Sequence, residues 1–178
     1  MSNCILVGNS SQDRKLGDVV DTFEHVYRFN RFRVNGFIEY VGTRCTHWVL
    51  NNALLGRNYY TDNIEKIKKQ HPELFQTIVI TGSEKNLTKL KALKSQYKDF
   101  DYHIDKDRLG KDKMSTGVLA VKYLIDSYDH ISLIGFDFGK SNHYWGNFGS
   151  SDVPGNHAWK DEQRYVDELV QSKKVEIL

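Results

Sequence analysis

The sequence has few cysteines, few prolines and no long apolar run. Its two cysteines, Cys4 and Cys45, form neither a CxxC pair nor a metal-ligand spacing, so neither a redox motif nor a zinc finger is indicated. No window reaches the roughly 18 apolar residues that a membrane helix needs, and the apolar run at 4–7 is too short for a signal peptide. We therefore expect a soluble, cytoplasmic protein with two reduced, buried thiols.

An excess of charge of either sign is also lacking. The chain has 25 Lys and Arg against 23 Asp and Glu, a formal net charge of +2, which gives no reason to expect nucleic acid or an anionic membrane as a partner. With only two prolines and no repeat or low-complexity linker, residues 1–178 are predicted to form a single domain. A chain of this length can bury a core without a disulfide or a structural metal.

Short apolar runs alternate with helical patterns along the chain. The runs are brief, often β-branched and bounded by Gly, Asn or Asp, which predicts strands at 4–7, 26–29, 48–50, 78–80 and 131–134, with 175–178 as an edge strand. Helices are predicted at 63–69, 84–97, 118–128 and 158–172, the last with Tyr165, Val166, Leu169 and Val170 on one face. This alternation predicts an α/β fold, a mostly parallel sheet with helices on both faces.

Ligands of such sheets bind beyond the carboxyl ends of the strands, and unusual residues follow the first two predicted strands. Gly8 permits a tight turn before Asn9 and Ser10, which offer short polar side chains and backbone N–H groups. The pattern is not GxGxxG, so no dinucleotide site is indicated, and an ordinary turn would also explain it. Asn30 ends the next strand, where its amide suits a base or ribose but equally a turn cap.

The segment Ser115-Thr116-Gly117 opens a predicted helix. A helix N-terminus presents unpaired N–H groups and a partial positive charge, which suit an anion. A helix cap without any ligand is the alternative.

Two histidines lie in or beside a long irregular run that begins at Gly135. His143 and His157 are 14 residues apart, and imidazoles in a polar loop suit anion contact and proton transfer near neutral pH. A zinc site is the rival interpretation, but the spacing fits no common motif, so no metal is expected. Two ordinary structural histidines would also account for the pattern.

Taken together and in order, these segments resemble the four signature motifs of the animal-type sialyltransferases, glycosyltransferase family 29. The likeness to the bacterial family 42 sialyltransferases is more distant. The first motif corresponds to residues 4–10 and runs on through Asp21, Val26, Arg28, Asn30, Gly36, Phe37 and 41–44; the second corresponds to 115–119 and 134–136, the third to 143–145, and the last to His157 with Glu162.

The resemblance implies a metal-independent, inverting transferase on a Rossmann-like, A-type glycosyltransferase fold, with CMP-sialic acid as donor substrate, a glycan hydroxyl as acceptor and no separate cofactor. It implies that His157 is the general base and that His143 lies near the departing phosphate. Glu162 is interpreted as an acidic residue in the first turn of a helix. The residues implied at the donor site are Asn9, Ser10, Asn30, Ser115, Thr116, Gly117, Gly135, Phe136 and Tyr144.

The sequence departs from the family at one cysteine. The family pairs the opening cysteine with one in the second motif, but here that position is Tyr128, so Cys4 lacks its expected partner. The chain is also shorter than the animal enzymes, and we expect it to lack their anchor and stem. The alternatives left open are a transferase of another CMP-linked keto-sugar acid such as CMP-Kdo, a CMP-sugar hydrolase, and a non-catalytic nucleotide- or glycan-binding module.

Overall fold

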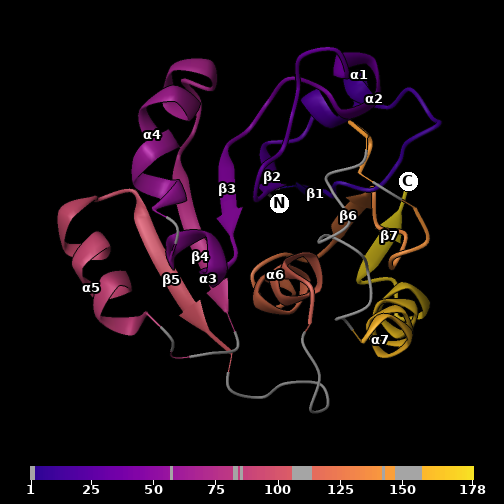
Figure 1. Cartoon of the computed structure of the whole chain (residues 1–178). Coiled ribbons are helices and arrows are strands. Elements are labelled where there is room, and N and C mark those ends of the chain that lie inside the picture. Colours follow the sequence, from indigo (N-terminus) through magenta and orange to yellow (C-terminus); the bar gives the residue numbers. More distant parts are fainter. Residues whose placement is uncertain are drawn as a thin grey trace.

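A parallel sheet forms the centre of the structure (Figure 1). The computed structural model describes residues 3–56, 58–81, 84, 86–105, 114–141, 143–146 and 158–178. Within these residues the sheet has seven strands, and every neighbouring pair is parallel. The strands are β1 (Cys4–Val7), β2 (His25–Phe29), β3 (His47–Leu50), β4 (Gln76–Thr81), β5 (Phe100–Ile104), β6 (Ile131–Ile134) and β7 (Val175–Ile177).

The strand order places a topological switch beside β1. The order is β5-β4-β3-β2-β1-β6-β7, so the chain builds outward from β1 in one direction and then returns to add β6 and β7 on its other side. Val7 at the end of β1 is level with Ile134 at the end of β6. Loops that leave neighbouring strands in opposite directions open a crevice, and ligands of doubly wound sheets bind there.

Helices cover both faces of the sheet, as the sequence predicts. Side chains alternate along β1: Leu6 packs in the cluster under α6 (Thr116–Leu124) and α7 (Trp159–Gln171), whereas Ile5 packs on the opposite face. The opposite face is covered by the remaining helices, α1 (Gly17–Asp21), α2 (Ile38–Val41), α3 (Asn52–Gly56), α4 (Tyr59–Gln70) and α5 (Leu87–Gln96). The α/β prediction is confirmed.

Some elements differ from the prediction. Strand β5 and helices α1 to α3 were not predicted: only Phe100 of β5 is fully buried, and the three helices are too short to show a periodic pattern. Helix α4 begins at Tyr59, earlier than predicted, and α6 ends at Leu124. The buried face assigned to the last helix is wrong at Val170, which is 37% exposed in the last turn of α7, whereas Val166 is fully buried.

Candidate functional site

Two glycines bring the ends of β1 and β6 into contact at the switch. The Gly8 N–H donates to the carbonyl oxygen of Ile134 at 2.8 Å, and the Ser10 N–H donates to that of Gly135 at 3.3 Å. A Cβ at Gly8 would lie 2.2 Å from the Gly135 oxygen, so no larger residue fits. Gly135 itself has a φ of +69°, which favours glycine. Both positions therefore require glycine for the loops after β1 and β6 to approach each other this closely.

The two predicted asparagines lie at the tips of neighbouring strands. Asn9 donates from Nδ2 to the carbonyl oxygen of Phe29 at 3.2 Å, and in the described part of the chain its buried Oδ1 has no hydrogen-bond partner. Asn30 adopts a positive φ of 50°, which asparagine tolerates better than most residues. Its Oδ1 accepts the Asn51 N–H at 2.8 Å, while its carbonyl oxygen accepts the Trp48 indole N–H at 2.8 Å. Oδ1 of Asn9 can thus accept a hydrogen bond from a ligand, whereas Oδ1 of Asn30 is hydrogen-bonded to the residue that follows β3.

The structure brings His143 next to Asn9. Ser10 and His143 form an antiparallel bridge, and the Tyr144 N–H donates to the Asn9 carbonyl oxygen at 3.0 Å. The same oxygen accepts from Nδ1 of His143 at 3.3 Å. The ring of His143 is exposed and stacks on Trp145 with 4.8 Å between centroids. Because Nδ1 is directed to the backbone, Nε2 is the ring nitrogen left for a ligand.

Tyr144 is hydrogen-bonded to and packed against the loop that follows β2. Its hydroxyl donates to the carbonyl oxygen of Arg33 and accepts the Arg33 N–H, and its ring meets Phe37 edge-on at 5.0 Å. Burial raises the pKa of Tyr144. In this structure the side chain therefore joins two loops at the carboxyl edge of the sheet, and its hydroxyl is already hydrogen-bonded within the protein.

The N-terminus of α6 lies at the same edge because this helix connects β5 to β6. Ser115 is the N-cap, and its hydroxyl accepts the Val118 N–H at 3.3 Å. Glu162, in the first turn of α7, accepts hydrogen bonds from both the N–H and the hydroxyl of Ser115, each at 2.6 Å. Ser115 is thus a cap, as one reading of the sequence allows, and it is also bound to a second helix.

Phe136 fills the space between this helix end and the sheet. A Cβ at Gly117 would lie 2.8 Å from the Phe136 ring, and that ring packs edge-on against Phe29 with 6.0 Å between centroids. Gly117 therefore permits the first turn of α6 to approach the loop after β6. This packing places the Ser115-Thr116-Gly117 segment beside the loops that carry Asn9 and Gly135.

Asp137 is a polar residue of this edge that the sequence did not single out. Its Oδ1 accepts the Ser10 hydroxyl at 2.7 Å and the Gly139 N–H at 3.1 Å, and its buried Oδ2 has no hydrogen-bond partner in the described part of the chain. The available signal was its position, directly after the Gly135-Phe136 pair at a strand end. A carboxylate here fixes the orientation of the Ser10 side chain.

Other residues of the first motif hold the fold together instead. Asp21 accepts the N–H groups of Thr43 and Arg44 at 2.8 and 2.9 Å. Arg28 is fully buried and donates to the carbonyl oxygens of Arg44 at 2.6 Å and Val41 at 2.7 Å; burial lowers its pKa. A buried arginine on these carbonyls stabilises the turn after α2, so this half of the motif has a structural role.

The structure thus brings together, at one edge, Asn9, Ser10, Asn30, Ser115, Thr116, Gly117, Gly135, Phe136, His143 and Tyr144. His157 lies outside the described residues. Among the residues that are described, no group of three His, Cys, Asp or Glu side chains could hold a metal ion, and no helix combines the length and the apolar character needed to span a membrane.

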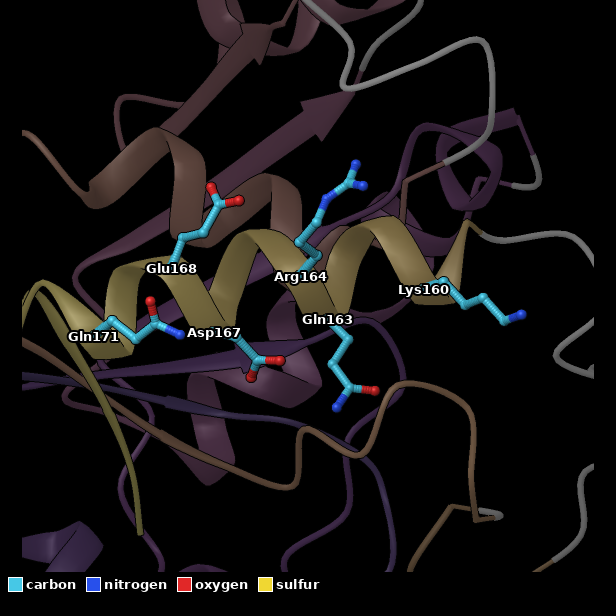
Figure 2. Close-up of a pocket in the computed structure, with 6 residues that line it drawn as sticks. All are labelled: Lys160, Gln163, Arg164, Asp167, Glu168 and Gln171. Carbon is cyan, nitrogen blue, oxygen red and sulfur yellow. The ribbon is translucent and has the colours of Figure 1, made fainter.

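A surface hollow elsewhere is not part of this edge. It lies on the outer side of α7, and all the side chains that line it come from that one helix (Figure 2). These are Lys160, Gln163, Arg164, Asp167, Glu168 and Gln171. Figure 2 shows them spreading in different directions from the helix, as expected of a solvent-facing surface.

The parallel sheet is doubly wound, with polar loops at its switch point and a helix N-terminus beside them. These features define an α/β domain of the class that commonly binds nucleotides at this edge. Residues 1–103 match the model of glycosyltransferase family 29 (sialyltransferase). The chain therefore belongs to this family. The matched region includes Asn9, Ser10 and Asn30 and ends before Ser115.

Known proteins resemble the chain in sequence and in fold. Sialyltransferase-like protein 2 of Arabidopsis thaliana is 24% identical over 157 residues, 86% of this chain and 34% of that protein; the chain thus spans about a third of the length of this relative. A mammalian sialyltransferase in complex with Gal-beta-1-3GalNAc-ortho-nitrophenol is 20% identical with a TM-score of 0.66, over 99% of this chain and 69% of that one.

A bacterial structure gives a similar result. The sialyltransferase CstII from Campylobacter jejuni, in complex with the substrate analogue CMP-3FNeuAc, is 17% identical with a TM-score of 0.72, over 99% of this chain and 81% of that one. At these identities the two structures show a shared fold. The resemblance to families 29 and 42 is confirmed by these matches.

Proposed function

We propose that the chain transfers sialic acid from CMP-sialic acid to a glycan hydroxyl with inversion at the anomeric carbon. The observation that carries this proposal is the pairing of Ser10 with His143. It places an exposed imidazole against the Asn9 loop, at the switch point of a family 29 domain. The mammalian and Campylobacter neighbours are in complex with Gal-beta-1-3GalNAc-ortho-nitrophenol and with the substrate analogue CMP-3FNeuAc, which supports the substrate class.

The donor would lie across the carboxyl ends of β1, β2 and β6. Asn9 and Asn30 would contact CMP, with Ser10, Gly135, Phe136 and Tyr144 shaping the loops around it. The start of α6 would bind the phosphate or the sugar carboxylate, because N–H groups and the helix dipole favour an anion there. Nε2 of His143 would meet the leaving phosphate, where negative charge grows as the glycosidic bond breaks.

The acceptor hydroxyl must lose a proton during the transfer, and we assign this step to His157. A neutral imidazole with an ordinary pKa of about 6.5 can take that proton near neutral pH. CMP is a better leaving group than a sugar hydroxyl, so the carboxylate pair of a glycosidase is not needed.

We also propose that the reaction needs no metal, since helix amides and His143 supply positive charge at the phosphate. A cytoplasmic setting belongs to the same proposal and matches two unpaired thiols.

The test is incubation with CMP-sialic acid, with and without galactoside acceptors and with and without EDTA, followed by CMP release and product mass. We expect CMP release that depends on the acceptor, a product heavier by one sialic acid, and the same rate in EDTA. Equal CMP release without any acceptor would indicate a hydrolase, and turnover of CMP-Kdo alone would change the donor sugar. Loss of activity in EDTA, restored by a divalent ion, would overturn metal independence. No turnover, together with a melting temperature unmoved by CMP, would overturn the proposal.

A further inference from the structure

Glu162 is a buried carboxylate between two helices of the site. It belongs to the first turn of α7 but is only 1% exposed. Its Oε1 accepts the N–H of Ser115 and its Oε2 accepts the hydroxyl of the same residue, both at 2.6 Å. The two residues are 47 positions apart, so the contact joins the N-terminus of α7 to that of α6.

The burial of Glu162 is not explained by an ordinary role at a helix start. An acidic residue in a first turn normally stays in solvent, as Asp161 does where it pairs with Arg164 at 2.9 Å on the surface. Burying a carboxylate is unfavourable unless hydrogen bonds replace its hydration. Here both of its oxygens are hydrogen-bonded to Ser115, and short bonds to an ionised acceptor are among the stronger hydrogen bonds in proteins.

This contact determines what Ser115 can do. The single hydroxyl hydrogen is donated to Glu162, and the oxygen accepts the Val118 N–H. The hydroxyl is therefore not available as a donor to a bound anion. In the described part of the chain, the N–H groups of Thr116 and Gly117 are the ones at this helix start without a hydrogen bond.

We propose that Glu162 is a positioning residue for the donor site: it fixes Ser115 and thereby orients the Thr116 and Gly117 N–H groups toward the CMP-sugar. This inference rests on the proposed function. Glu162 does not itself contact the donor, because both of its oxygens are already hydrogen-bonded to Ser115. Its contribution is to hold the first turn of α6 in one orientation before the donor binds, which reduces the ordering that binding requires.

The test compares Glu162→Ala and Glu162→Gln with two control variants on the same helix, Glu168→Ala and Glu168→Gln, where the side chain is exposed. Amide hydrogen exchange at residues 115–118 is measured without ligand, CMP affinity by calorimetry, and KM for donor and acceptor separately. In Glu162→Ala we expect faster exchange at 115–118, and a CMP Kd and donor KM raised roughly 10- to 100-fold, as for loss of hydrogen bonds to a charged group. The acceptor KM should not change.

Glu162→Gln should lie between Glu162→Ala and the wild type. Its amide oxygen can still accept the Ser115 N–H, but its NH2 group cannot accept the Ser115 hydroxyl. A purely structural role would lower the melting temperature of the Glu162 variants. The exchange rates at 115–118 and the CMP affinity of the folded protein would then equal those of the Glu168 variants, and this result would overturn the inference. If Glu162→Ala does not fold, Glu162→Gln decides in the same way. Since the exchange measurement needs no ligand, it separates failure of this inference from failure of the proposed function, which would show as a wild-type protein that does not bind CMP.

Discussion

Nδ1 of His143 lies 3.3 Å from the carbonyl oxygen of Asn9, although the two residues are 134 positions apart. The backbone of the neighbouring Tyr144 contacts the same oxygen. Two short segments that are far apart in the sequence therefore form one loop surface at the switch point.

Replacement of His143 by alanine should weaken CMP binding and lower turnover together. Charge on the phosphate rises as the donor bond breaks, so loss of one positioned donor should lower kcat by roughly 10²-fold. Calorimetry with CMP and steady-state kinetics measure the two effects. Because the ring is exposed, stability should change by no more than about 0.5 kcal/mol. The control is His130→Ala, an exposed histidine outside the proposed site that bonds to the Lys173 carbonyl oxygen; equal effects of the two variants would contradict the role of His143.

CMP should raise the melting temperature, and NAD or ATP should not. A ligand at about a hundred times its Kd adds roughly 2.7 kcal/mol to the free energy of unfolding. Differential scanning fluorimetry with each nucleotide at millimolar concentration measures the shift. A protein stabilised by NAD but not by CMP would contradict the nucleotide assignment, which rests on Asn9, Asn30 and the start of α6.

The free energy of unfolding should decrease as the pH falls below neutral, because of His47 at the start of β3. Burial, with a smaller effect of His25, lowers the pKa of His47 to about 4; its ring stacks on Tyr27 at 4.2 Å and its Nδ1 lies 2.9 Å from the Thr46 hydroxyl. In the unfolded chain a histidine binds its proton near pH 6.5. Between these two values the unfolded state binds more protons, so stability rises with pH from about 4 to 6.5.

The measurement is urea denaturation of the wild type and His47→Gln across this pH range. The difference between the two pKa values corresponds to about 3 kcal/mol of unfolding free energy, and the glutamine variant should lose that part of the pH dependence. His130→Gln, on an exposed histidine, should keep it. Parallel pH curves for the wild type and His47→Gln would show that His47 does not titrate in this way.

Both thiols should be unreactive in the folded protein and reactive after unfolding. Cys4 and Cys45 are buried and form no disulfide, and burial raises the pKa of each to about 12, so little thiolate is available. Tyr128, at the position where the family has its second cysteine, packs against the cluster that contains Cys4 and bonds to the Tyr27 hydroxyl at 3.0 Å. Alkylation without reductant, read by mass spectrometry, should add two groups in urea and none in buffer. A Cys4–Cys45 disulfide would contradict this and the reducing compartment.

Most of the sheet and most of the edge could be predicted from the sequence because both depend on local signals, whereas β5 lacks a buried apolar run. The strands at 4–7 and 131–134 are short, fully buried apolar runs, and their bounds match the structure. The polar residues that follow parallel strands necessarily reach the same edge. These signals were sufficient to name Asn9, Asn30 and the start of α6.

Contacts between distant residues could not be predicted in the same way. Nothing local indicates that Glu162 turns inward to Ser115, since its spacing suits an exposed first-turn charge equally well. Asp137 and Tyr144 show the same limit: each lies at the predicted edge, but the partner of its side chain, Ser10 or Arg33, comes from another loop. Side-chain direction at a loop depends on the packing of the whole domain, which a single sequence does not display.

The last prediction concerns His157, whose role follows from the family resemblance. His157→Ala should lower kcat by roughly 10²- to 10⁴-fold, because the acceptor hydroxyl then has no base to receive its proton. CMP affinity should change little, since the base serves the acceptor and not the nucleotide. His143→Ala, by contrast, should change both quantities. Steady-state kinetics and CMP calorimetry on the two variants distinguish these patterns.

The pH profile gives an independent check on the same residue. A base must be neutral to accept a proton, so kcat/KM should rise with pH through the pKa of an imidazole. This rise should be absent from the residual activity of His157→Ala. If the variant loses activity only in proportion to its unfolded fraction, His157 is a structural residue; if it is folded and turns over at a near-normal rate, another group is the base. Hydroxylamine or imidazole added to His157→Ala would partly restore turnover only where a missing base limits the rate, which separates a lost base from a distorted site.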